Sequence, residues 1–147
     1  MIITISLLAL LATFYQLHLQ RIHNEKSLKP LAQIDFVDRD KLSVHIQNNG
    51  VGPLIVNKLT FFKGEKTFHS IKDCLTIDPK SYQHILITDT AKKVIMAGTY
   101  FEIFSTIFDE EDTIEFKDKV RRELASITLI VEGKDIYDNN VTVERKL

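Results

Sequence analysis

The first long stretch of apolar positions covers residues 2–19 (IITISLLALLATFYQLHL) and contains no Asp, Glu, Lys or Arg. At a rise of about 1.5 Å per residue, a helix of this length extends about 27 Å, close to the roughly 30 Å hydrocarbon core of a bilayer. Its polar residues are scattered, whereas a helix packed on a soluble core gathers them on one face. We therefore expect residues 1–20 to form a transmembrane anchor that contacts the lipid bilayer through Ile2–Leu19.

A cleaved secretory signal is the main alternative for this run. Such a signal needs basic residues before the apolar segment and a small-x-small cleavage site after it. No basic side chain precedes Ile2, and the run is followed by Gln20-Arg21-Ile22-His23. The sequence therefore predicts a segment that is retained.

The flanking charges indicate which side of the membrane holds the rest of the chain. Arg21, Lys26 and Lys29 all follow the apolar run, within a polar neck of residues 21–30 that ends at Pro30. The positive-inside rule then places the following domain in the cytoplasm. The single cysteine, Cys74, agrees with this side, because it has no partner for an internal disulfide.

Beyond Pro30 the apolar positions recur every second residue, which is typical of strands. In residues 41–47 the alternation is strict, with Leu42, Val44 and Ile46 on one face. The predicted strands are 31–37, 41–47, 54–63, 82–88, 99–108, 126–132 and 141–146, with 67–70 as a further candidate for pairing. Residues 71–76 fit either a loop or one helical turn.

The run 99–108 has apolar residues on both faces. Phe101, Ile103 and Ile107 should share one face, and Phe104 and Phe108 the other. Because a strand at the edge of a half-exposed sheet needs only one apolar face, we expect this strand to be central or packed on both sides.

One helix is predicted within the domain. Asp112-Thr113-Ile114-Glu115 resembles a capping box, and Phe116, Val120 and Leu124 follow at a spacing of four residues. About seven strands and one connecting helix predict that residues 31–147 are mainly β and form an immunoglobulin-like antiparallel β-sandwich, although the Cys-Trp-Cys core of antibody domains is missing.

Composition excludes some function classes without selecting one. Charged residues make up 27% of the chain, the formal net charge is −1, and acids and bases are mixed along the sequence. A nucleic-acid partner is therefore not expected, since it would call for a basic patch. We also expect no cofactor.

Two groups of residues have side chains that could form reactive or metal-binding sites. Cys74, near His69, His84, Asp73 and Asp78, could form a Cys-His nucleophile or a metal site, but the spacing lacks paired ligands, and a core thiol is the favoured interpretation. The acidic run 109–112 could bind Ca²⁺, but it lacks spaced ligands and a central glycine, so a solvated turn before the helix is favoured.

Two turns also carry groups that could bind a ligand. The amides of residues 49–53 could cradle an anion, but no Lys or Ser/Thr follows as in a phosphate loop, and a structural turn is favoured. Tyr137 with Asp135 and Asp138 could form a small polar site, although a hairpin with a packed tyrosine is commoner. We therefore assign no catalytic, cofactor-binding or metal-binding residue.

Three segments carry a family resemblance: KPLAQIDF (29–36), SVHIQNNGVGPLIV (43–56) and ITLIVEGKDIYDNN (127–140). They resemble small bacterial single-pass membrane-anchored β-sandwich proteins of unknown function. In that group a Lys/Glu-Pro pair opens the first strand, an Asn-x-Gly-x-Gly-Pro turn follows the second, and an aromatic-Asp-x-Tyr-Gly-Asn segment lies in the last hairpin. This chain departs at Gly133, where an aromatic is usual, and at Asn139, where glycine is. The resemblance implies the fold and the anchor, and no activity.

The sequence as a whole favours a membrane-anchored, non-enzymatic module that binds a protein partner at the cytoplasmic face, as an accessory or sensor subunit. One alternative is an envelope-facing domain that binds a carbohydrate or envelope component. The other is a small hydrolase that uses Cys74.

Overall fold

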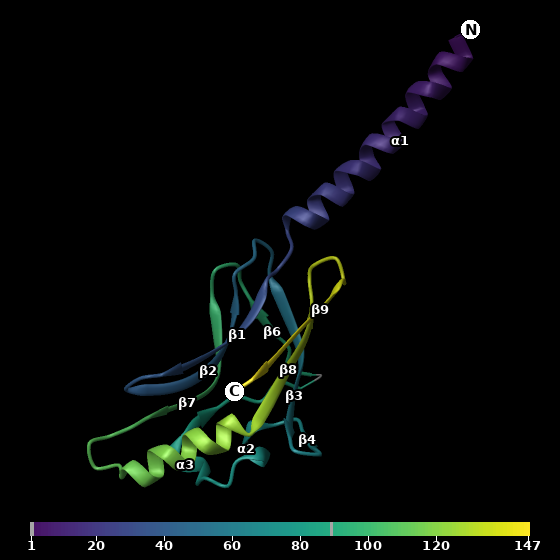
Figure 1. Ribbon diagram of the computed structural model, residues 1–147. Coiled ribbons are helices and arrows are strands. Elements are labelled where there is room, and N and C mark those ends of the chain that lie inside the picture. Colours follow the sequence, from purple (N-terminus) through teal and green to yellow (C-terminus); the bar gives the residue numbers. More distant parts are fainter. Residues whose placement is uncertain (1, 89) are drawn as a thin grey trace.

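The computed structural model describes residues 2–88 and 90–147. A long helix, α1 (Ile2–Ser27), projects from one end of a β domain (Figure 1). It continues without a break from the apolar run through most of the neck, and it ends shortly before Pro30, as expected from the conformations that proline disfavours in the residue before it.

Two antiparallel sheets make up the domain, as predicted. The first, sheet A, contains β1 (Ala32–Asp38), β2 (Lys41–Asn48), β7 (Tyr100–Ile107) and β5 (Gln83–His84), in the order β1-β2-β7-β5. The second, sheet B, has the order β4-β3-β8-β9, formed by β4 (Lys66–Phe68), β3 (Leu54–Lys63), β8 (Ile127–Lys134) and β9 (Asn140–Lys146). A short strand, β6 (Lys93–Ile95), also pairs with β3.

The inner faces of the two sheets form one apolar core. Leu42, Val44 and Ile46 of β2 have no exposed surface, so the predicted alternation is confirmed. They belong to the same buried cluster as Phe61 of β3 and Leu129 of β8. Burying an aliphatic or aromatic side chain of this size stabilises a fold by about 1.5–3 kcal/mol, so this shared cluster is what holds the sheets together.

Strand β7 is central in sheet A, with β2 on one side and β5 on the other, as its two apolar faces predicted. The predicted faces themselves were wrong, because a bulge interrupts the strand. Val44 pairs with Phe104 and His45 with Glu102, which leaves Ile103 as an extra residue. Ile103 and Phe104 are therefore both buried, whereas Ile107 is exposed.

The predicted strand 82–88 was also too long. Only β5, Gln83–His84, pairs with β7 as a strand, and after Ile85 donates to the carbonyl of Ile103 at 3.1 Å the chain leaves the sheet. The ambiguous segment at 71–76 contains one helical turn, α2 (Ile71–Cys74), and a 3-10 turn follows at Pro79–Ser81.

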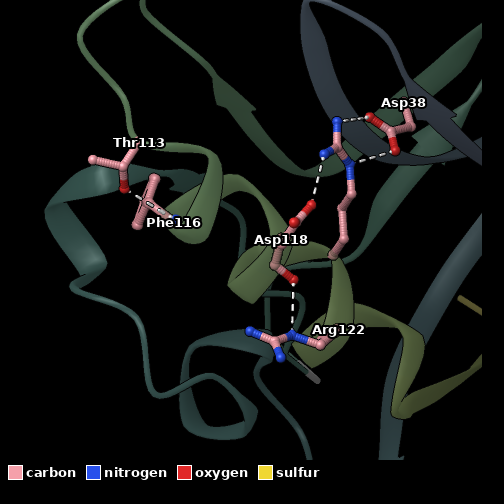
Figure 2. A network of polar contacts seen from close by, with 6 residues as sticks. Asp38, Thr113, Phe116, Asp118 and Arg122 are labelled. Carbon is pink, nitrogen blue, oxygen red and sulfur yellow. Dashed lines mark hydrogen bonds and ion pairs between the residues drawn. The ribbon is translucent and has the colours of Figure 1, made fainter.

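Helix α3 (Ile114–Ala125) connects β7 of sheet A to β8 of sheet B, and it lies at the end of the domain opposite α1 (Figure 1). Val120 and Leu124 of the predicted stripe are buried in the core. The predicted capping box was shifted by one residue: the hydroxyl of Thr113, and not Asp112, accepts from the amide of Phe116 at 3.2 Å (Figure 2).

Arg121 fastens the outer side of α3 to sheet A. Its guanidinium forms a two-pronged ion pair with Asp38 at the end of β1, with Nε–Oδ2 at 2.8 Å and Nη2–Oδ1 at 3.1 Å. Asp118, one turn earlier on α3, accepts from the same guanidinium at 3.3 Å (Figure 2). The planar guanidinium of arginine suits this paired geometry, and the ion pair holds α3 against the end of sheet A.

Candidate functional site

The most densely connected polar residue of the domain is Asn48, the last residue of β2, which has no exposed surface. Its side-chain oxygen accepts from the amides of Leu31 at 3.1 Å and Gly50 at 3.0 Å. Its side-chain nitrogen donates to the carbonyls of Gly52 at 2.8 Å and Ile95 at 3.1 Å. One buried amide therefore joins the neck below α1, the turn after β2, and β6.

The backbone of Asn48 extends this junction to a further loop. Its amide donates to the carbonyl of Thr99 at 3.0 Å, and its carbonyl accepts from Gly98 at 2.8 Å. The loop between β6 and β7 is thereby held against the end of β2. Because buried polar groups that lose their partners are costly, the site is stable only with all these contacts in place.

The turn after β2 also grips the neck directly. The amide of Asn49 donates to the carbonyl of Leu31 at 2.9 Å, and the amide of Val51 donates to that of Lys29 at 3.2 Å. A Cβ on Gly50 would overlap the backbone of Lys29 and Leu31. The close approach of two backbones, and not an unusual φ angle, therefore explains why glycine occupies this position.

Gly52 has the same role one step further along. A Cβ there would overlap the carbonyl of Leu28, the residue that follows the last helical residue of α1. The Asn-x-Gly-x-Gly-Pro pattern of residues 48–53 is thus a clamp: the asparagine supplies the hydrogen bonds, and the glycines let the neck lie flat on the turn. We call residues 28–31 and 48–53 together the neck clamp.

This geometry engages most of the amides that an anion cradle would use. The amides of Asn49, Gly50 and Val51 all donate to acceptors within the chain. The structure therefore agrees with the favoured interpretation of a structural turn.

Cys74 lies in the core and is 3% exposed. Its thiol is within 3.4 Å of the carbonyl of Ser70. Burial raises the pKa of the thiol to about 11, although the nearby Lys63 opposes the shift. A nucleophilic cysteine needs a lowered pKa, so the surroundings of Cys74 favour a core thiol.

The histidines and aspartates near Cys74 in the sequence do not form a reactive group with it. His69 lies on the surface after β4, and His84 stacks on Tyr82 with ring centroids 5.5 Å apart. Asp78 caps the 3-10 turn by accepting from the amide of Lys80 at 3.0 Å, and Asp73 lies exposed in α2. Within residues 2–88 and 90–147, no three His, Cys, Asp or Glu side chains are placed to hold a metal ion together.

The acidic run 109–112 forms a closed turn before α3. The carboxylate of Asp112 accepts from the amide of Asp109 at 2.8 Å, and the amide of Asp112 donates to the carbonyl of Asp109 at 3.1 Å. These contacts agree with a turn that leads into the helix.

The segment around Tyr137 is a turn organised by Asp135, which is 3% exposed. Its carboxylate accepts from the amides of Tyr137 at 2.8 Å and Asn139 at 2.9 Å, and from the side chain of Asn139 at 2.9 Å. Asp138 has the positive φ of this turn, 64°. The position that suits glycine is therefore Asp138, one residue before the expected Asn139.

Two carboxylates, the buried Asp135 and the half-buried Glu123, make stability depend on pH. Burial alone would raise the pKa of Asp135, but the hydrogen bonds from Asn139 and Tyr137 outweigh it and hold this pKa below its ordinary value. Burial would also raise the pKa of Glu123, but the hydrogen bonds from Thr76 and the charge of Lys63 lower it below its ordinary value. Each carboxylate therefore stabilises the fold at pH values above the ordinary carboxyl pKa of roughly 4. This stabilisation is lost as the pH falls through the lowered pKa of the folded state.

We therefore expect the free energy of unfolding to fall steadily as the pH drops below about 4.5, the upper end of the window set by ordinary carboxyl groups. Urea denaturation at a series of pH values measures this. The Asp135→Asn variant should show a shallower acid slope than the wild-type chain, while Asp109→Asn, whose side chain is exposed, should keep the full slope. An unchanged slope in Asp135→Asn would contradict the assignment.

Sequence reasoning missed Asn48, although a signal was present. The alternation of Leu42, Val44 and Ile46 continues to residue 48, which places its amide on the core side of β2. A polar side chain at a core position must find hydrogen-bond partners, so the alternating pattern alone indicates a buried network.

A scan against protein-family models found no match for the chain, and a search of curated proteins found none either.

Proposed function

We propose that this protein is a membrane-anchored, non-enzymatic, immunoglobulin-like β-sandwich module that binds a protein partner at the cytoplasmic face of a bacterial inner membrane. The observation that carries the proposal is α1, which is long and apolar enough to span a bilayer. Its ten large apolar side chains from Ile3 to Leu19 are 47–83% exposed. Each would gain about 1.5–3 kcal/mol on leaving water, which supports lipid as their surroundings.

The neck clamp supports a structural role for this anchor. A tether that only kept the domain near the membrane would need no fixed joint, and a flexible linker would serve. Instead, Asn48, Gly50 and Gly52 lock the chain within four residues of the end of α1. Such a joint suits a module that presents one face to a neighbour in the membrane.

The cytoplasmic side is supported by Arg21, Lys26 and Lys29, which all follow the apolar run. A cysteine introduced at Ile114, which is 77% exposed, tests it with a membrane-impermeant maleimide. The wild-type chain is the matched control, because Cys74 is buried. We expect labelling of Ile114→Cys only after the cells are opened, and labelling in intact cells would instead favour the envelope-facing alternative.

The outer face of sheet B supports the protein-binding part of the proposal. A shallow hollow of about 320 Å³ lies there, lined by Lys58, Thr60, Phe62, Thr67, His69, Ile130 and Glu132. The hydroxyl of Thr60 is buried without a hydrogen-bond partner in the described part of the chain, and its residue is 6% exposed. The lining itself combines apolar side chains, Phe62 and Ile130, with charged ones, Lys58 and Glu132, and this mixture favours the hollow as a protein contact surface.

A photo-crosslinking amino acid at Thr67, on the rim of this hollow, tests the surface in living cells. The matched control is Gln33, which is exposed on β1 of the other sheet. We expect a discrete crosslinked adduct from Thr67 and none from Gln33. The proposal fails if Thr67 gives no discrete adduct, or if both positions give the same adducts.

A further inference from the structure

Five exposed apolar side chains gather at the end of the sandwich from which α1 leaves. Leu31, Val51, Met96, Tyr100 and Ile136 are each 46–69% exposed. They belong to the residue between the neck and β1, the β2–β3 turn, the β6–β7 loop, the start of β7 and the β8–β9 loop. Figure 1 shows these connections together around the base of α1. We call this set the apolar collar.

The collar loops also lack charge. Residues 48–54 (NNGVGPL) and 95–101 (IMAGTYF) contain no Asp, Glu, Lys or Arg, in a chain that is 27% charged. Of the two acids in the β8–β9 loop, Asp135 is buried in its turn, and Asp138 is exposed and paired with Lys134 at 3.4 Å. A surface of this composition is costly in water and is tolerated at the boundary of a membrane, where tyrosine is also common.

The length of the neck fixes how near the collar lies to lipid. The apolar run ends at Leu19, and α1 continues for eight residues to Ser27, which corresponds to about 12 Å along the helix. The headgroup layer on each side of the hydrocarbon core is roughly 5–8 Å thick, and tilted helices bring their flanks closer to the bilayer. The end of α1 therefore lies about 4–7 Å beyond the headgroups for an untilted helix, a gap that helix tilt shortens and that the collar side chains can span.

The neck clamp prevents the collar from swinging away. Leu31 is fixed to Asn48 and Asn49, and the β6–β7 loop is fixed to Asn48 through Gly98 and Thr99. The collar and the residues that directly follow α1 are thus joined by these hydrogen bonds.

We propose that the apolar collar rests on the lipid headgroup layer of the bilayer that α1 spans, so that the sandwich stands upright on the membrane. This inference rests on the proposed membrane anchoring. The inference also adds to the proposed function, because an upright sandwich presents the outer face of sheet B sideways, to a partner in the same membrane.

The test uses single tryptophans, because the chain has none of its own. The full-length variants Val51→Trp and Met96→Trp are reconstituted in phosphatidylcholine–phosphatidylglycerol vesicles that carry a nitroxide label on the lipid headgroup. Ile107→Trp is the matched control: Ile107 is 68% exposed, against 69% for Val51, but it lies at the opposite end of the sandwich. We expect a loss of fluorescence for Val51→Trp and Met96→Trp and little loss for Ile107→Trp.

A fourth variant separates this inference from the anchoring itself. Leu11→Trp, in the middle of the apolar run, should be quenched by a nitroxide on the lipid acyl chain if α1 spans the bilayer. Quenching at Leu11 with equal, weak headgroup quenching at Val51, Met96 and Ile107 would overturn the collar proposal and leave the anchor intact. The absence of quenching at Leu11 would overturn both. Because the vesicles hold no other protein, a collar that binds a protein instead of lipid gives the first of these contrary results.

Discussion

Replacing Asn48 with alanine should destabilise the sandwich by about 4 kcal/mol. The substitution removes four side-chain hydrogen bonds and leaves two buried carbonyls, of Gly52 and Ile95, and two partly buried amides, of Leu31 and Gly50, without their partner. An unsatisfied buried group costs about 1–3 kcal/mol, and we take the lower end because the loop can admit water. Domains of this size have a total stability of about 5–15 kcal/mol, so the loss is a large share of it.

The measurement is urea denaturation of the full chain in a mild detergent, followed by the circular dichroism of the sheets. Asn49→Ala is the matched control: it is the same substitution one residue later, and it removes one exposed side-chain bond to Gln33. We expect that control to change the free energy of unfolding by no more than about 0.5 kcal/mol, as surface substitutions usually do. Equal effects of the two substitutions would show that Asn48 does not hold the junction.

Replacing Gly52 with alanine should have the next largest effect, a loss of about 3 kcal/mol, which is typical of forced overpacking. The new Cβ would overlap the carbonyl of Leu28, and that contact can be relieved only if the neck moves away from the turn. The core around Val44 and Phe61 is remote from this contact and should keep its packing.

Amide hydrogen exchange distinguishes this local opening from general unfolding. In Gly52→Ala, protection should fall at Leu31, Asn49 and Val51, whose amides form the neck clamp, and should persist in the β3–β8 ladder. Val51→Ala is the control within the same turn, because its exposed side chain can be shortened without a clash. Uniform loss of protection throughout both sheets would contradict a local clamp.

The sequence predicted the layered fold well because period-two patterns report burial directly. The boundaries of β2 and β3 and the buried stripe of α3 follow from side chains that must face the core, such as Val44 and Val120. The long apolar helix α1 was equally visible, since its run of apolar residues carries no charged side chain from Ile2 to Leu19.

The failures have a common physical origin, which is that local sequence does not reveal a partner far along the chain. The bulge at Ile103 depends on how β2 pairs with β7, and the early end of β5 depends on the path after His84. The cap is an exception with a local cause: Thr113 caps the helix because Asp112 is engaged with Asp109, three residues earlier. The four partners of Asn48 likewise lie up to 47 residues away.

The central claim is that residues 1–20 are an anchor outside the core of the sandwich. Alkaline extraction of membranes from cells that produce the full chain, or a chain lacking residues 1–20, tests this most directly. The full chain should stay in the membrane pellet, and the shortened chain should be soluble, with the sheet signal of a folded domain. A shortened chain that aggregates would mean that the apolar run belongs to the core, and release of the full chain by alkali would mean that α1 does not span the membrane.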